Sequence, residues 1–190
     1  DVQAGDMKFP VMITYIGGLG DVYDLYTDNI EQSTNWEIQS EFHIPVGISF
    51  HPFYEFNYGL RIGGGLGPLM FVYISGPDVS YFDAPLNVHV GYTIIPRSPV
   101  SPYVKTGFVY HINTGDYLES TSPGLLLAGG IDFLRNKRVS FGLEVAMDFS
   151  EVTFEDRTEY YYDPYNPYDY RSGEKKIKTG GLLIGMFVRF

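Results

Sequence analysis

The sequence contains no cysteine and a single tryptophan, Trp36, in 190 residues. The absence of cysteine excludes a disulfide framework and thiolate chemistry. No run of about 18 uncharged apolar residues occurs, so the sequence predicts no transmembrane helix. Basic residues are scarce, because 13 Lys and Arg stand against 23 Asp and Glu. The resulting net charge of -10 argues against a nucleic-acid partner, which requires clustered cations.

Glycine, proline and aromatic residues are abundant instead, with 22 Gly, 12 Pro, 17 Tyr and 14 Phe. This composition favours strands and turns over helices and indicates an all-β protein. A length of 190 residues fits one domain spanning 1-190. The first residue, Asp1, follows no apolar signal core, which is expected of a mature exported chain.

Apolar side chains alternate with polar or small ones through most of the sequence. The clearest run, 36–50, places mainly large apolar residues on one face and polar residues or glycine on the other. The chain also ends in such a run: Leu182, Ile184, Met186, Val188 and Phe190. A period of two indicates β-strands with one apolar face. Further outward-facing runs are predicted at Phe56, Tyr58, Leu60, Ile62, Leu66, Met70, Val72 and Ile74, at 82–94, at 100–112, at 125–133 and at 139–149.

With a weaker first run around 9–17, the sequence predicts eight strands. Short turns are expected at 51–55, 96–99 and 135–138, and longer loops at 18–35, 75–80, 113–123 and 150–175. Short turns at one end and long loops at the other are typical of an outer-membrane barrel with both termini in the periplasm. The long loops hold most of the acidic residues, so the external end is expected to be acidic.

Alternation alone does not decide which face points outward, because a soluble barrel would bury its apolar face. The polar face carries many glycines, which weaken a water-exposed strand but make room inside a narrow barrel. We therefore expect an eight-stranded antiparallel transmembrane β-barrel with up-and-down meander topology and lipid on its apolar face.

This pattern resembles the small bacterial outer-membrane barrels of the OmpA, OmpX and OmpW kind. The resemblance rests on the eight runs, the loop asymmetry and the closing Phe190, and it covers nearly the whole chain. It implies a Gram-negative outer membrane, contact with its lipid and lipopolysaccharide, and insertion by the barrel-assembly machinery. That machinery would read the last strand, with Phe190 as its assembly signal.

Charged residues at inward positions are predicted to form a lumen ion-pair network, since unpaired charges in a narrow lumen are costly. The network is expected to contain Glu41, Arg61, Lys105, Glu144, Asp148, His43 and His89. Other residues expected to face inward are Glu37, Asp83, His111, Lys178 and Arg189. We favour a polar plug over a proton-sensitive conduit, because eight strands enclose little more than their own side chains.

Catalytic and metal sites are not indicated. The four histidines lie on separate segments without metal-ligand spacing, so no metal or other cofactor is expected. A lipid A deacylase would need a lipid-facing Ser and His, whereas these histidines are expected to face inward. An apolar internal pocket for a small hydrophobic ligand remains an alternative, lined by Leu69, Phe71, Tyr73, Tyr81 and Tyr103.

The fourth long loop carries six tyrosines and two prolines over twelve residues. Tyrosine supplies rigid amphipathic contact area of the kind found in binding surfaces. The candidate contact residues are Tyr160, Tyr161, Tyr162, Tyr165, Tyr168 and Tyr170. A binding role, with an extracellular protein as the possible partner, and a merely solubilising role remain open.

The function predicted from the sequence is a structural or surface-interaction role for a non-enzymatic outer-membrane barrel. A narrow channel for small hydrophobic or ionic solutes is the alternative, and a lipid A-modifying enzyme ranks third.

Overall fold

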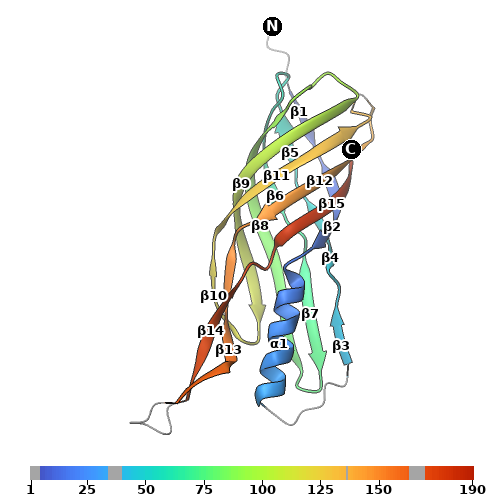
Figure 1. Cartoon of the computed structure of the whole chain (residues 1–190). Coiled ribbons are helices and arrows are strands. Elements are labelled where there is room, and N and C mark those ends of the chain that lie inside the picture. Colours follow the sequence, from blue (N-terminus) through green and yellow to red (C-terminus); the bar gives the residue numbers. More distant parts are fainter. Residues whose placement is uncertain (1–4, 34–39, 136, 163–169) are drawn as a thin grey trace.

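The computed structural model describes residues 5–33, 40–135, 137–162 and 170–190, without the side chains of 32–33, 40–42, 157–162 and 170–172 (Figure 1). Eight antiparallel strands form a closed meander, which confirms the predicted barrel. The first three strands are interrupted: β1 (Asp6–Lys8) with β2 (Pro10–Ile16); β3 (Ser40–His43), β4 (Val46–Phe50) and β5 (Phe53–Glu55); β6 (Leu60–Leu66) with β7 (Met70–Ser75). The others are β8 (Val79–Thr93), β9 (Val100–Gly115), β11 (Gly124–Phe133), β12 (Ser140–Asp148) and β15 (Gly181–Arg189), which pairs with β2 to close the barrel.

The outer wall of the barrel is a belt of exposed apolar side chains. Phe108 is 66% exposed, Met186 64% and Ile48 62%, although all three belong to regular strands. Their neighbours along each strand face the lumen, as the alternating burial of β12 and β15 shows. An apolar surface of this extent on a regular barrel matches a hydrocarbon environment. The predicted outward runs at 82–94, 100–112, 139–149 and 182–190 are therefore confirmed.

The two ends of the barrel differ. The turn end, at the top of Figure 1, carries the described N-terminal residues, the C-terminus and the connections at 56–59, 94–99 and 134–139. The loop end, at the bottom, carries the longer connections. The turn after the second strand lies at 56–59 and is closed by a hydrogen bond from Gly59 N to Phe56 O. The predicted turn at 51–55 is wrong, because β5 continues the second strand and pairs with β6.

The third strand changes register between β6 and β7. Leu66 pairs with Leu86 and Met70 with Asp83, so four residues on the third strand span three on β8. This extra residue is a β-bulge, which moves the following side chains to the opposite face. The outward prediction for Met70, Val72 and Ile74 is therefore wrong, because all three are buried. Leu69 and Phe71 are exposed instead, which corrects their predicted inward position.

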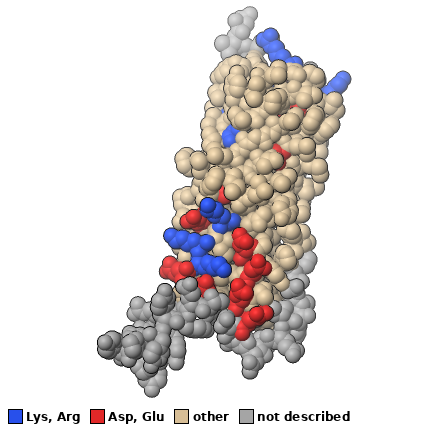
Figure 2. Space-filling model, viewed as in Figure 1, with Lys and Arg blue, Asp and Glu red and all other residues tan. Residues whose placement is uncertain are grey.

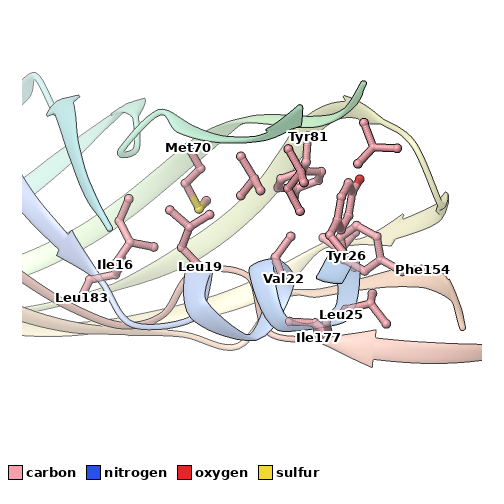
Figure 3. Packing of buried hydrophobic residues seen from close by; sticks show 14 of the residues in the cluster. Ile16, Leu19, Val22, Leu25, Tyr26, Met70, Tyr81, Phe154, Ile177 and Leu183 are labelled. Atoms are coloured by element: carbon pink, nitrogen blue, oxygen red, sulfur yellow. The ribbon is translucent and has the colours of Figure 1, made fainter. Parts of the chain in front are cut away.

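A helix, α1 (Leu19–Ser33), fills the loop end of the lumen where the sequence predicted only a loop at 18–35. Its apolar residues recur at helical spacing and include Leu19, Val22 and Leu25. These side chains are fully buried among inward residues of the barrel wall (Figure 3). Because the bulge turns Met70, Val72 and Ile74 inward, the helix has an apolar surface to pack against.

Three further strands extend beyond the barrel at the loop end. They are β10 (Leu118–Ser122), β13 (Glu151–Tyr162) and β14 (Tyr170–Ile177), which form a sheet in the order β10-β13-β14 (Figure 1). The predicted loops at 113–123 and 150–175 therefore contain regular structure. β13 and β14 make a hairpin whose ends lead to residues 163–169, outside the described part of the chain.

Two inward glycines show how a narrow barrel accommodates aromatic rings. A Cβ atom on Gly142 would lie 2.3 Å from the Phe187 ring, and one on Gly130 would lie 2.5 Å from the Tyr103 ring. The absence of a side chain at these positions leaves the volume that each ring occupies.

Candidate functional site

The lumen near the turn end contains a cluster of five charged residues, which we call the turn-end cluster: Glu55, Arg61, Asp132, Arg135 and Arg189. Asp132 Oδ2 accepts hydrogen bonds from Arg61 and from Arg189 Nη1, the latter at 3.0 Å, and lies 3.4 Å from Arg135 Nη1. Glu55 forms an ion pair with Arg135 and lies 3.7 Å from Arg61 Nε. These groups come from β5, from β6, from β11 with the turn that follows it, and from β15, and they connect opposite walls of the barrel.

The turn-end cluster is buried, so its charges depend on one another. Asp132 is fully buried, and Arg61 and Arg189 are 4% and 3% exposed. The guanidinium of Arg61 also lies 4.2 Å from the Tyr103 ring centroid and 4.8 Å from that of Phe53. Arginine suits such a position because its planar group both stacks on rings and donates several hydrogen bonds.

A second group occupies the middle of the lumen. Lys105 Nζ lies 2.8 Å from Glu144 Oε1, and the Tyr103 hydroxyl donates to Glu144 Oε2 at 2.7 Å. Beside this pair, Asn87 contacts two imidazoles, His51 at 3.0 Å and His89 at 3.0 Å. The two histidines thus contact a neutral amide, while the charged pair is satisfied separately.

A third group surrounds His111 toward the loop end. Its Nδ1 lies 2.5 Å from Asp83 Oδ2 and its Nε2 lies 3.0 Å from Asp148 Oδ2. Ser150 Oγ is 2.6 Å from the same Nε2, and the Tyr81 hydroxyl donates to Asp83 at 3.0 Å. An imidazolium donates from both nitrogens, so it satisfies carboxylates on β8 and β12 at once.

The connection from Ser150 through His111 to Asp83 resembles that of a serine hydrolase, but its surroundings do not fit catalysis. Ser150 and Asp83 are fully buried, and His111 is 1% exposed. Asp148 also bonds both the serine hydroxyl and the imidazole nitrogen that would act as base. Ser150 lines neither of the two lumen cavities around the other groups.

The structure distributes the predicted network residues over these separate groups. Arg61 belongs to the turn-end cluster, Lys105 pairs with Glu144, and Asp148 pairs with His111. His89 lies in the lumen and contacts Asn87, whereas His43 stacks on the Tyr23 ring of α1 at 4.2 Å. The side chain of Glu41, the tyrosine side chains at 160–162 and 170, and Tyr165 and Tyr168 lie outside the described part. Phe190 is 63% exposed at the turn end.

Sequence reasoning missed three members of the turn-end cluster: Glu55, Asp132 and Arg135. Asp132 lies between the outward Ile131 and Phe133, so strand parity alone places it inward. Glu55 and Arg135 were assigned to turns, where parity gives no information. Conversely, Lys178 was predicted to face the lumen but is exposed, and its ammonium lies 5.6 Å from the Phe149 ring centroid.

The described side chains leave little free space in the lumen. Two small cavities remain, of about 30 Å³ and 20 Å³, around the turn-end cluster and the middle group. Each is large enough for about one water molecule. Toward the loop end, α1 occupies the lumen, and at the turn end a wider polar pocket of about 260 Å³ is lined by Glu55 and Arg135.

α1 is held in place by polar contacts as well as by apolar packing. The Tyr26 hydroxyl donates to the backbone carbonyls of Asp116 and Ser80, and Asn29 Nδ2 donates to Glu155 O at 2.8 Å. Burial, reinforced by the nearby Asp116, raises the pKa of Tyr26 above its ordinary value. The phenol therefore remains protonated in the folded protein.

Within the described residues, no group of three or more His, Asp or Glu side chains is arranged to hold a metal ion. Among those residues there is also no helix long and apolar enough to cross a membrane.

Comparisons with known proteins agree with the closed barrel. The structure is similar to the outer membrane protein OprG from Pseudomonas aeruginosa, with a TM-score of 0.56, 11% identity and coverage of 100% of this chain and 99% of that one. It is also similar to outer membrane protein AlkL in lipid bilayers, with a TM-score of 0.55, 11% identity and coverage of 100% and 91%. Neisserial surface protein A matches at a TM-score of 0.47 and 10% identity over 98% of each chain. Neither a protein-family profile nor a curated protein sequence matches the chain.

The chain thus has the fold of the small eight-stranded outer-membrane β-barrels, as its sequence pattern predicts. At 11% identity these similarities support the fold alone. The role of this barrel has to be argued from its own side chains.

Proposed function

We propose that this protein is a non-conducting, non-enzymatic barrel of the bacterial outer membrane that presents its β13–β14 hairpin for contacts at the cell surface. The turn end would face the periplasm and the loop end the exterior. The observation that carries the proposal is the packed lumen, in which the charged clusters surround two water-sized cavities and α1 occupies the loop end. A wider polar pocket of about 260 Å³ lies at the turn end, where Glu55 and Arg135 line it.

Two features of the loop end support a contact role. The β10-β13-β14 sheet extends the polypeptide beyond the apolar belt, and α1 packs against β13 through buried residues such as Phe154. In the sequence, β13 and β14 flank the tyrosine-rich segment. Rigid aromatic contact area lowers the entropy cost of binding.

Adhesion of cells that produce the protein tests the contact role. Adhesion to immobilised extracellular protein, and cell-to-cell aggregation, should fall when residues 160–170 are deleted. A second variant with all six tyrosines changed to serine keeps the loop length and should show the same loss. Unchanged adhesion in both variants, with the barrel present at normal levels, would contradict the proposed contact role.

Planar-bilayer recording tests the non-conducting part of the proposal. The wild-type protein should give no conductance steps, because the opposite charges within each lumen cluster pair with one another and the packed side chains exclude solutes. Reproducible steps that disappear when Arg61 or Glu144 is neutralised would favour the channel instead. A mass shift of lipid A on expression of the protein would favour an enzyme.

A further inference from the structure

Three exposed lysines lie at the loop end in an otherwise acidic region, and we call Lys176 and Lys178 the outer lysine pair. Lys175 and Lys176 lie on β14, and Lys178 follows its last residue, Ile177. Ile177 is buried in the cluster around α1, so strand alternation places Lys176 and Lys178 on the opposite, outer side. Figure 2 shows basic atoms beside acidic ones near the loop end, whereas the band above them is almost free of charge.

Lys178 lies at the edge of the apolar belt. Its ammonium is 5.6 Å from the ring centroid of Phe149, and Phe149 is 39% exposed on the outer face, two residues beyond Met147. An aromatic ring at a bilayer interface lies at the level of the lipid headgroups. Lys178 therefore lies at the depth where lipid phosphates are found, and Lys176 follows two residues farther toward the loop end on the same side of the chain.

A shallow apolar groove extends along the outer wall from this edge toward the turn end. It begins at Met147 and Leu182 at the loop end, crosses the strands diagonally and reaches Leu60 and Tyr92 near the turn end. Its volume is about 720 Å³ and its lining is almost entirely apolar.

Gly129 forms part of the floor of the groove. A Cβ atom added there would have one neighbour within 4 Å, Tyr103 O at 3.7 Å. The depression therefore exists because this outward position has no side chain.

An apolar groove with ammonium groups beyond its loop-end residues fits an amphiphile that has an anionic head and a long acyl chain. We propose that the outer wall is a binding site for lipid A, with phosphate on the outer lysine pair and an acyl chain in the groove. The inference rests on the proposed outer-membrane location with the loop end outward. That orientation places the lysines in the leaflet that lipid A occupies.

Charge favours lipid A over a glycerophospholipid. Lipid A carries two phosphates, each able to accept charge-assisted hydrogen bonds from lysine. The exposed Glu174 lies two residues before Lys176, on the same side of β14. Its negative charge lowers the attraction of the outer lysine pair for a headgroup with a single negative charge. A ligand that engages both Lys176 and Lys178 overcomes this repulsion better than one that engages a single ammonium.

Native mass spectrometry of the folded protein in detergent micelles, titrated with diphosphoryl lipid A, tests the site. Lys176→Gln and Lys178→Gln should each weaken binding about fivefold, and the double variant about 30-fold. Lys175→Gln is the matched control, since Lys175 lies on the opposite side of β14, and it should bind like the wild type.

The groove has its own pair of variants. Gly129→Leu fills the floor of the groove without a backbone clash and should reduce lipid A binding while leaving the lysines intact. Ala84→Leu adds the same side chain to an outward position that does not line the groove, and it should leave binding unchanged.

Heat-modifiable migration on gels shows whether each variant is folded. If the double variant does not fold, the two single lysine variants test the proposal. Equal lipid A affinity in the wild type and the lysine variants overturns the proposal. Equal affinity of the wild type for phosphatidylglycerol overturns the choice of lipid A. Loss of lipid binding leaves the adhesion experiment unaffected, so the two proposals fail separately.

Discussion

At the scale of single residues, Asp132 is the main link of the turn-end cluster. One buried carboxylate serves three arginines from β6, from the connection after β11 and from β15. Removing one member of a buried ion network leaves the remaining charges without compensation, and that loss costs more than the pair itself contributes.

We therefore expect Asp132→Asn to lower the free energy of unfolding by about 3–5 kcal/mol, because three buried guanidinium groups lose their shared counter-charge. Urea unfolding in detergent micelles, followed by gel mobility, measures the change. Asp6→Asn is the matched control, since Asp6 is exposed and its ion pair is with the nearby Lys8, at 3.4 Å. A loss for Asp132→Asn no larger than that of the control would contradict this role.

Tyr26 gives a prediction for alkaline pH. Burial raises its pKa in the folded state, so the unfolded chain loses the phenolic proton first as the pH rises above about 10. The stabilising effect of this residue is therefore complete below pH 10 and declines above it. Between pH 9 and 11 the wild type should lose more stability than Tyr26→Phe, in which nothing at this position titrates. Parallel unfolding curves for the two proteins at every pH would show that Tyr26 is not responsible.

At the scale of elements, α1 and the bulge before β7 depend on each other. The helix was foreseeable from the spacing of Leu19, Val22, Leu25, Tyr26 and Ile30, although the many polar residues between them favour a loop. The bulge was not foreseeable from parity, because Met70, Val72 and Ile74 alternate as well in one register as in the other. Only the helix on the inner side makes the inward register favourable.

Leu25→Ala should loosen α1 without unfolding the barrel. A cavity of this kind costs about 2–5 kcal/mol, which corresponds to at least a thirtyfold increase in local opening. Chymotrypsin cleavage near Tyr23 and Tyr26 should accelerate accordingly, while the barrel keeps its folded gel mobility. Asp24→Ala, on the exposed side of the same helix, should be cleaved at the wild-type rate. If both variants are cleaved equally slowly, the helix is not held by its apolar face.

At the scale of the whole molecule, the apolar belt and the closed ring of strands define a protein that requires hydrocarbon around it. Residues on this outer surface can therefore affect assembly in the membrane without affecting the stability of the folded barrel. Phe190 is 63% exposed at the end of the last strand, so it contributes little to internal packing. Its proposed role is recognition by the barrel-assembly machinery.

Phe190→Ser should therefore lower the amount of assembled barrel in cells several-fold while the purified, refolded protein unfolds at the wild-type urea concentration. Phe141→Ser is a suitable control, because Phe141 is an outward aromatic at the same end of the barrel, 49% exposed, and lies on β12. Assembly reduced equally by both substitutions would indicate a general need for interfacial aromatics and no specific signal.

The sequence by itself determined the all-β class, the eight strands, the lipid-facing side of the wall and the difference between the two ends. These follow from side-chain alternation and turn chemistry, which are local properties of the chain. The tertiary structure alone decided the pairing of Asp132 with three arginines, the place of α1 in the lumen and the outward position of Lys178. The first two depend on which strands face one another across the barrel, and strand parity carries no information about that. The position of Lys178 depends on where β14 ends and on its contact with Phe149.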